Sequence, residues 1–325
     1  MNPVLSAEHF HSEETAYEYV EARLWPNGPV CPKCGNADPD RIGRLNGKST
    51  RIGLRKCYAC REPFNVKVGT VMESSHVPLR VWLQAIYLLC SSKKGISTRQ
   101  LQRAFGCGLK TAWFLSHRVR EAMADLKRAP EGAVGPLGGA GATVEIDETY
   151  VGGEAVNRHA NKRGRGRGVH DKAPVFALVE RHGRVRAFHV PEVNGTNLAK
   201  IVAENVKAGS TVYSDENHAT QYSAKGFKRD TVNHRAGEYV RDKVSTNTVE
   251  GFFGIVKRGL DGVYHSVSKE HLDRYLAEFS FRYSNRSALG VEDVERADLA
   301  LRGVKGKRLT YATPRSGKGS RALVE

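Results

Sequence analysis

The segment ATVEIDETY at residues 142–150 is the stretch around which the rest of this chain is organised. Val144 and Ile146 are β-prone residues that alternate with polar ones, which predicts a short strand with one buried face. Asp147 is expected where this strand ends, ahead of the glycine turn at 152–153. A carboxylate there is held by a core strand and still reaches solvent, which suits metal binding or catalysis. Surface acids at strand ends are common, so a function requires partners elsewhere in the chain.

The composition indicates a basic globular protein that binds a polyanion. The chain has 325 residues, of which 40% are hydrophobic, and 51 Lys+Arg against 35 Asp+Glu give a net charge of +16. The length suits two or three domains, and such a charge excess is typical of nucleic-acid binding. No apolar run approaches the roughly 20 residues that a membrane helix needs. The acidic N-terminus lacks the pattern of a signal peptide, so we expect a cytoplasmic protein.

Four of the six cysteines form two pairs with metal-ligand spacing. Each pair has the C-x2-C spacing, and Gly35 after the first pair allows a sharp turn. Two such pairs offer four thiolates to one tetrahedral Zn²⁺. We therefore predict one structural zinc in a ribbon over residues 29–70. The predicted ligands are Cys31, Cys34, Cys57 and Cys60.

Helices are predicted on both sides of this ribbon. A short amphipathic helix is predicted at 13–24, within an N-terminal segment at 1–28, and residues 76–128 have a helical pattern. A short turn at 106–108 separates two of the later helices, the second of which carries Lys110 and Arg118. This arrangement predicts a helix-turn-helix that contacts DNA, with a plain helical hairpin as the alternative.

A Gly/Pro-rich linker at 129–141 leads into an α/β domain at 142–288. Within this domain the patterns predict further strands at 173–180, 185–190, 210–215 and 231–234, and helices at 196–207, 246–260 and 269–285. Residues 155–172 are basic and glycine-rich, which predicts a mobile loop that contacts DNA phosphates. Residues 289–325 are predicted to be a basic C-terminal tail. The arginines singled out in the loop are Arg163, Arg165 and Arg167.

Three acids of the α/β domain are predicted to meet. Asp147 ends the first strand, Asp215 ends the fourth, and Glu250 lies on the following helix. If the two strands are neighbours, their ends bring the aspartates together, and a helix across the sheet adds Glu250. Such carboxylates repel one another unless cations bind between them. Two hard cations about 4 Å apart activate a water or hydroxyl and stabilise the leaving oxygen of a phosphodiester. Lys257 and Asn247 are predicted to share the helix face of Glu250.

Two acids beside Asp147 are expected to take no part in this site. Glu145 alternates with the buried positions of the strand, and Glu148 should point to the opposite side from Asp147.

Three motifs resemble those of the DDE transposases of bacterial insertion sequences, in the group with an N-terminal zinc ribbon. They are VEIDETYVGG, TVYSDENHATQY and STNTVEGFFGIVKRGL with its continuation. The predicted order of strands and helices is similar to the ribonuclease H-like fold, which implies a mixed five-stranded sheet. The resemblance implies Asp147 and Asp215 as metal-binding aspartates, Glu250 as the third acid and Lys257 as the accompanying basic residue. Some transposases of this group have an asparagine as the third metal ligand. Asn247 is therefore the alternative to Glu250.

The resemblance implies a transposase that binds the terminal inverted repeats of its element and uses two Mg²⁺ (or Mn²⁺) ions. Water would nick the DNA strand, and the freed 3′-hydroxyl would attack target DNA. Because two ends must be cut together, a homodimer or larger assembly on DNA is expected, associated with the nucleoid when acting. The alternatives are a DNA-binding regulator or domesticated transposase, and a metal-dependent nuclease of the same fold.

Overall fold

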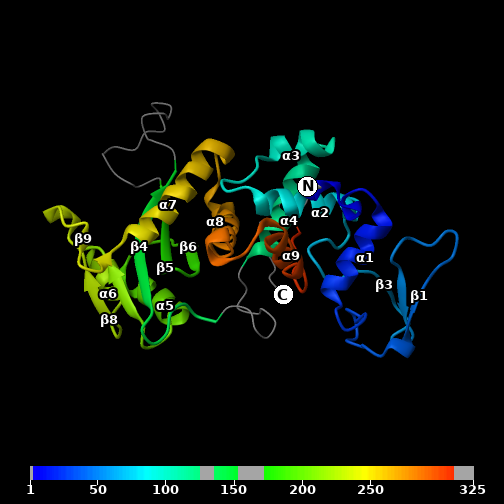
Figure 1. Cartoon of the computed structure of the whole chain (residues 1–325), viewed down its shortest axis with the longest axis horizontal. Helices are drawn as coiled ribbons and strands as arrows, with labels where there is room; N and C mark the ends of the chain where they lie inside the picture. Colours follow the sequence, from blue (N-terminus) through cyan, green and yellow to red (C-terminus); the bar gives the residue numbers. More distant parts are fainter. Residues whose placement is uncertain (1–2, 125–134, 153–171, 311–325) are drawn as a thin grey trace, which may run out of the picture.

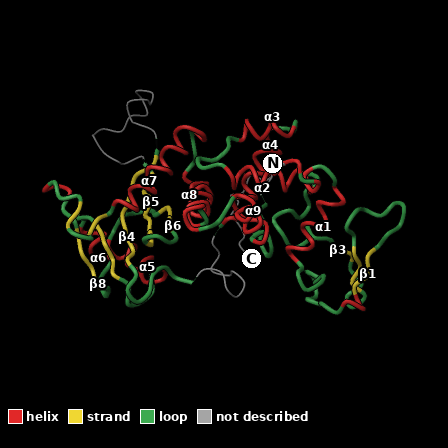
Figure 2. Tube along the Cα trace, viewed as in Figure 1, coloured by secondary structure: helices red, strands yellow, loops and turns green. Residues whose placement is uncertain are grey.

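The computed structural model of the chain describes residues 3–124, 135–152 and 172–310. Figure 1 shows an elongated arrangement of these parts, with a small sheet at one end and a larger sheet at the other. Helices occupy the middle, as the colouring of Figure 2 makes clear. None of the helices in these three ranges is long and apolar enough to cross a membrane.

The small sheet belongs to the ribbon predicted from the cysteine pairs. Its antiparallel strands are β1 (Ile42–Arg44), β2 (Arg55–Cys57) and β3 (Pro63–Phe64). Its core is small, with the buried side chains of Ile42 and Phe64 beside two of the cysteines. So little apolar burial leaves the ribbon dependent on a further source of stability.

The central helices share one hydrophobic core. They are α1 (Glu13–Leu24), α2 (Leu79–Ser91), α3 (Thr98–Phe105), α4 (Leu109–Met123) and α9 (Asp293–Arg302). Apolar side chains of α1, α2, α4 and α9 form this core, in which Trp82 and Leu115 are almost completely buried. The first four helices lie where the sequence predicted them. The predicted end of α4 differs, because Ala124 is already extended and residues 125–128 lie outside the described ranges.

Helix α9 occupies part of the segment that the sequence assigned to a basic tail. Ala300 and Leu301 at its end, with Val304 just beyond, are buried against the helical core. Most other residues of α9 are polar, so its helical character becomes evident only when α2 and α1 are packed against it. Of the predicted tail, residues 311–325 lie outside the described part.

The large sheet has five strands of mixed direction, as predicted. They are β4 (Thr143–Val151), β5 (Ala173–Glu180), β6 (Val185–His189), β7 (Thr211–Ser214) and β8 (Lys228–Thr231). The spatial order is β6-β5-β4-β7-β8. The β4–β5 and β5–β6 pairs are antiparallel, whereas β4–β7 and β7–β8 are parallel. The last strand begins at Lys228, a little earlier than its predicted position at 231–234.

Helices cover both faces of this sheet. On one face, α5 (Gly195–Asn205) and α6 (His218–Ser223) pack over Val144 and Ile146 of β4. On the other, α7 (Asn247–Gly259) and α8 (Lys269–Ser284) pack over β5 and β6. Before α7 comes the hairpin of β9 (Val240–Arg241) and β10 (Val244–Ser245). The end of the predicted linker also joins this domain, because Leu137 is buried and bridges to Val206.

A buried ion network joins the helical core to the α/β domain. Glu278 on α8 accepts a hydrogen bond from Arg120 Nε of α4 at 2.6 Å, and neither side chain is exposed. Arg282, one turn along α8, and the hydroxyl of Tyr264 also donate to Glu278. The carboxylate is thus surrounded by donors inside a dry interface, where an unpaired charge is strongly unfavourable.

We predict that Glu278→Ala lowers the free energy of unfolding by about 3–5 kcal/mol, because it leaves two buried guanidinium groups without their counter-ion. Asp230→Ala is the matched control, since its ion pair with Arg241 is about half exposed (48% and 49%). That loss should stay below about 1 kcal/mol. Urea unfolding of both variants measures the difference, and similar small changes would contradict a structural role for the network.

Candidate active site and zinc site

The register between β4 and β7 places Asp147 next to Asp215. β7 pairs in parallel with the first part of β4, ending with Glu145 opposite Tyr213. Continuing this register by two residues brings Asp147 level with Asp215, directly after β7 ends. The neighbouring strands expected from the sequence are therefore present. One detail differs, because β4 runs past Asp147 to Val151 while paired with β5.

Three carboxylates meet at this edge of the sheet. One oxygen from each of Asp147, Glu148 and Asp215 lies within 4.8 Å of the others. Backbone N–H groups orient two of them: Glu148 N donates to Asp147 Oδ1 at 2.8 Å, and Asn217 N donates to Asp215 Oδ1 at 3.1 Å. The aspartates that the sequence predicted to meet do so.

The expectation that Glu148 stays away from this site is wrong. Its carboxylate lies in the cluster, where it accepts hydrogen bonds from the side-chain amide of Asn217 and from Thr220 Oγ1, the latter at 2.6 Å. Strand alternation does direct Glu148 towards the face covered by α6. The donors at the start of α6 then hold its carboxylate beside Asp215.

The electrostatics of the cluster favour a bound cation. Burial, followed by the charges of Asp215 and Glu148, raises the pKa of Asp147 to about 8. Burial also raises the pKa of Asp215 and that of Glu148. Carboxylate oxygens are the ligands of Mg²⁺ and Mn²⁺, and a divalent cation would relieve the repulsion that these shifts express. The donor set therefore fits the predicted metal.

Glu250 stands beside the cluster rather than inside it. Its charge is among the causes of the raised pKa of Asp147, yet it does not belong to the group of three acids within 4.8 Å. Its Oε1 accepts a hydrogen bond from Thr246 Oγ1 at 2.8 Å and lies 3.8 Å from His234 Nε2. With its side chain 44% exposed, Glu250 has room to turn towards the aspartates.

The other residues predicted on α7 take different places. Lys257 is exposed near the end of the helix. Asn247 lines a separate hollow of about 440 Å³, together with Arg181, Lys243 and Arg286. It thus faces basic residues, whereas Glu250 contacts His234.

Sequence reasoning missed two side chains around the acids. His234 had been left among scattered histidines, and only the tertiary fold brings it to Glu250. Glu145 stays outside the group of three acids, but its expected place among the non-buried positions of the strand is incorrect, since it is fully buried and contacts the start of α7. A signal for it existed, because residues two apart on a strand share a face, and Asp147 is two residues on.

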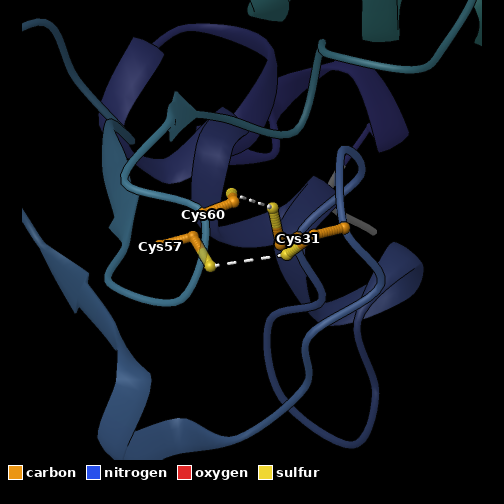
Figure 3. A group of neighbouring side chains, drawn as sticks. Cys31, Cys57 and Cys60 are labelled. Atoms are coloured by element: carbon orange, nitrogen blue, oxygen red, sulfur yellow. Dashed lines mark hydrogen bonds between the residues drawn. The ribbon is translucent and has the colours of Figure 1, made fainter.

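The four predicted zinc ligands converge. The Sγ atoms of Cys31 and Cys60 are 3.7 Å apart, as are those of Cys34 and Cys57. Four sulfurs each about 2.3 Å from a tetrahedral Zn²⁺ would be about 3.8 Å apart, so the spacing fits zinc. Figure 3 shows the side chains of Cys31, Cys57 and Cys60 turned towards one another. The backbone N–H of Cys60 lowers the pKa of the Cys57 thiol to about 6, whereas burial and the neighbouring thiols raise the pKa of Cys34 and that of Cys60. Zinc binding would therefore displace protons from this cluster.

The residues predicted to contact DNA have unequal exposure. Lys110 is exposed at the start of α4. Arg118 is half-buried, and its Nη1 donates to the carbonyl oxygen of Glu73 at 3.1 Å. Gly106 ends α3 with a φ of 60°, a left-handed conformation that glycine adopts without strain. The three loop residues Arg163, Arg165 and Arg167 lie outside the described ranges.

Two known domain families match this chain. The ISXO2-like transposase domain matches residues 136–284, and the transposase zinc-ribbon domain matches residues 11–62. The chain is also 31% identical over 286 residues to an uncharacterized protein in transposable element ISH50 of Halobacterium salinarum, covering 84% of this chain and 91% of that one. The chain therefore belongs to the ISXO2-like transposase family with an N-terminal zinc ribbon.

Two further similarities are weaker. An uncharacterized transposase-like protein of Haemophilus influenzae is 29% identical over 97 residues, which cover 30% of this chain and 77% of that protein. A chain from the cryo-electron microscopy structure of the simian T-cell lymphotropic virus intasome in complex with PP2A regulatory subunit B56 gamma matches with a TM-score of 0.27 and 14% identity. That match covers 55% of this chain and 63% of the viral-complex chain, and a score this low supports no inference about the fold.

We predict that purified, reduced protein contains one tightly bound zinc per chain and that Cys57→Ser loses it. Zinc binding contributes about 10–16 kcal/mol to the folding of zinc-finger peptides, so the ribbon of this variant should unfold locally. Cys107→Ser is the control, because Cys107 lies in the turn between α3 and α4, away from the four ligands. Metal analysis decides the matter, and zinc-free reduced wild-type protein would contradict the assignment.

We predict that the stability of Mg²⁺-free protein falls as pH rises from about 4 to about 8. A carboxyl with a raised folded-state pKa stabilises the fold below its unfolded pKa, and this stability is lost as pH rises through the folded value. The loss for Asp147 should reach a few kcal/mol, because each pKa unit corresponds to about 1.4 kcal/mol. Mg²⁺ should therefore raise the melting temperature more at pH 8.5 than at pH 5.5.

Asp147→Asn provides the comparison, since it removes the titrating group and keeps the shape. This variant should be more stable than wild type at pH 8.5 without Mg²⁺ and should respond less to the cation. Thermal unfolding at several pH values, in buffer without chelator so that zinc is retained, measures both effects. An identical pH slope in wild type and variant would show that Asp147 is not the group responsible.

Proposed function

We propose that this chain is a DDE-type transposase. It would hydrolyse a phosphodiester at the ends of its element, and the freed 3′-hydroxyl would then attack a phosphodiester of target DNA and displace the 3′-oxygen of the target strand. The observation that carries the proposal is the meeting of Asp147 and Asp215 at one sheet edge, with Glu250 beside them on α7. Family membership and the net charge of +16 support DNA as the substrate. The order β4-β5-β6-α5-β7-α6-β8-α7 supports a ribonuclease H-like fold for this domain.

Each acid has a distinct part in this proposal. Asp147 and Asp215 hold the two divalent cations from rigid backbone positions, and Glu250 completes the site from α7. When bound, the cations would activate the attacking water or hydroxyl and stabilise the leaving oxygen. Lys257, about two turns beyond Glu250 on α7, would hold a DNA phosphate. Glu148 keeps the segment after Asp215 in place through Asn217 and Thr220.

DNA recognition is assigned to the N-terminal half. In the proposal α3 and α4 form a helix-turn-helix, with exposed Lys110 contacting DNA, and the zinc ribbon adds to recognition of the inverted repeats. Two ends must be cut in concert, so the active species is a dimer or larger assembly on DNA. Phosphate contacts by the basic surface should make binding strongly salt-dependent.

We predict that Asp147→Asn, Asp215→Asn and Glu250→Gln each lower strand cleavage at least about 100-fold in Mg²⁺, because each removes a charge that holds a catalytic cation. Lys257→Ala should lower it about tenfold, as expected for one charged hydrogen bond. Asp230→Asn, on the neighbouring strand β8, should cleave like wild type. The assay uses DNA carrying the terminal inverted repeats. Gel-shift binding should be retained in the three acid variants and in Asp230→Asn, and should be modestly weaker in Lys257→Ala, which loses a phosphate contact.

The same assay separates the alternatives. A regulator would bind the repeats without cutting them, and cleavage that persists in Asp147→Asn or Asp215→Asn would disprove the catalytic assignment. A nuclease that reads DNA or hybrid structure would cut equally well when the repeats are scrambled. A transposase should cut only the intact repeats and join the product to a second DNA.

A further inference from the structure

Glu145 is a fully buried acid that lies between the two elements carrying catalytic acids. It is on β4, two residues before Asp147 and on the same face of the strand. Its Oε2 accepts hydrogen bonds from the backbone N–H groups of Thr248, at 2.7 Å, and Val249, at 3.1 Å. These residues are in the first turn of α7, directly before Glu250. One side chain therefore joins the strand of Asp147 to the helix of Glu250.

Helix α7 depends on this acid for its N-terminal cap. The first N–H groups of a helix have no partner within the helix, and a side chain at the N-cap position usually accepts from one of them. Thr246, at that position, makes no such bond, and its hydroxyl donates to Glu250 instead. Glu145 replaces the missing cap from another element, and its negative charge also suits the positive end of the helix.

Arg181 completes the connection. Its Nε donates to Glu145 Oε1 at 2.6 Å, which balances the buried charge. Its other nitrogens donate to the carbonyl oxygen of Lys243 at 2.6 Å and to the backbone and side-chain oxygens of Ser245. The segment that leads from the β9–β10 hairpin into α7 is thus held by the ion pair between Arg181 and Glu145 of β4.

We propose that Glu145 is a positioning residue that sets the distance between Asp147 and Glu250. It acts through α7 rather than by touching DNA or a cation. The inference rests on the proposed function, because Glu250 matters only if it completes the cation site. Since Glu250 is 44% exposed and its side chain contacts Thr246 and His234, its place relative to Asp147 is set by how α7 is anchored.

Glu145→Gln tests this with little change of shape. Both carboxylate oxygens of Glu145 accept from donors, Oε1 from Arg181 and the Thr248 hydroxyl and Oε2 from backbone N–H groups. Either orientation of the glutamine amide therefore places an N–H₂ group against donors. The anchor of α7 weakens while the volume of the side chain is unchanged.

Glu13→Gln is a matched control elsewhere in the chain. Glu13 caps α2 in the same manner, accepting from Leu79 N at 2.7 Å and Arg80 N at 3.2 Å. Its replacement also sets an amide against a backbone donor, but in the helical core. A purely structural role for Glu145 predicts that the two variants behave alike.

The readout is Mn²⁺ affinity without DNA, from the electron paramagnetic resonance signal of free Mn²⁺ in zinc-loaded protein. We expect both variants to melt at lower temperature and Glu145→Gln alone to bind Mn²⁺ about tenfold or more weakly, as for other residues that orient a metal ligand. The double variant Glu145→Gln with Glu250→Gln should bind no more weakly than Glu250→Gln alone, because both changes remove one contribution.

Unchanged Mn²⁺ affinity in Glu145→Gln, or losses that add to those of Glu250→Gln, would overturn the proposal. If Glu145→Gln does not fold, Thr248→Ala removes only the hydroxyl that donates to Glu145 at 2.9 Å. It should weaken Mn²⁺ binding about twofold, the scale of part of one hydrogen bond, and no change would overturn the proposal. Wild-type protein that binds Mn²⁺ but fails to cleave element ends would refute the proposed function alone.

Discussion

The parallel pairing of β4 with β7 is the constraint on which the site depends. Its register, with Glu145 opposite Tyr213, brings Asp147 level with Asp215. A shift by one residue would turn one aspartate to the other face of the sheet. The apolar residues of β4 and β7 prevent such a shift, because Val144, Ile146 and Val212 are buried under α5. The hydrophobic core therefore fixes the geometry of the acids, even though it contributes no polar group to them.

Buried charged groups then fix how the helices are placed against the sheet and against one another. Inside the protein, Glu145 fastens α7 to β4, and Glu278 fastens α4 to α8. Both acids are fully buried and surrounded by donors, so each specifies one arrangement of its neighbours. The carboxylates at the sheet edge differ, since the pKa of Asp147 is raised by burial and by nearby acids. Repulsion between acids that no protein cation neutralises is typical of a site that binds a ligand.

Much of the fold and of the acid site was predictable from the amino-acid sequence. The cysteine spacing indicated the ribbon, and period-two and helical patterns located most strands and helices of the α/β domain. The meeting of Asp147 and Asp215 followed from the expected pairing of the first and fourth strands, although Asp147 lies within β4 rather than at its end. What the sequence did not reveal depends on tertiary partners. Half of the residues of helix α9 are charged, and His234 is brought to Glu250 only by folding.

The two acids misjudged from the sequence illustrate the same limit. Strand alternation placed Glu148 correctly on the face opposite Asp147, yet donors on α6 return its carboxylate to the cluster. Glu145 was expected to be uninvolved because it alternates with the buried residues Val144 and Ile146. It is nevertheless fully buried, against Arg181 and the start of α7, which lie 36 and about 100 residues further on. Strand alternation predicts the face of the sheet from which a side chain projects. The position of its charged group depends on contacts with residues far away in the sequence.

The central claim is that this edge of the sheet is a divalent-cation site formed by Asp147, Asp215 and Glu250. Crystals grown with Mn²⁺ and measured for its anomalous scattering test that claim most directly. The account predicts Mn²⁺ bound by both aspartates, with Glu250 turned in from α7 to complete the site. Crystals with no Mn²⁺ at this edge, or with Asn247 in place of Glu250 as a ligand, would contradict it.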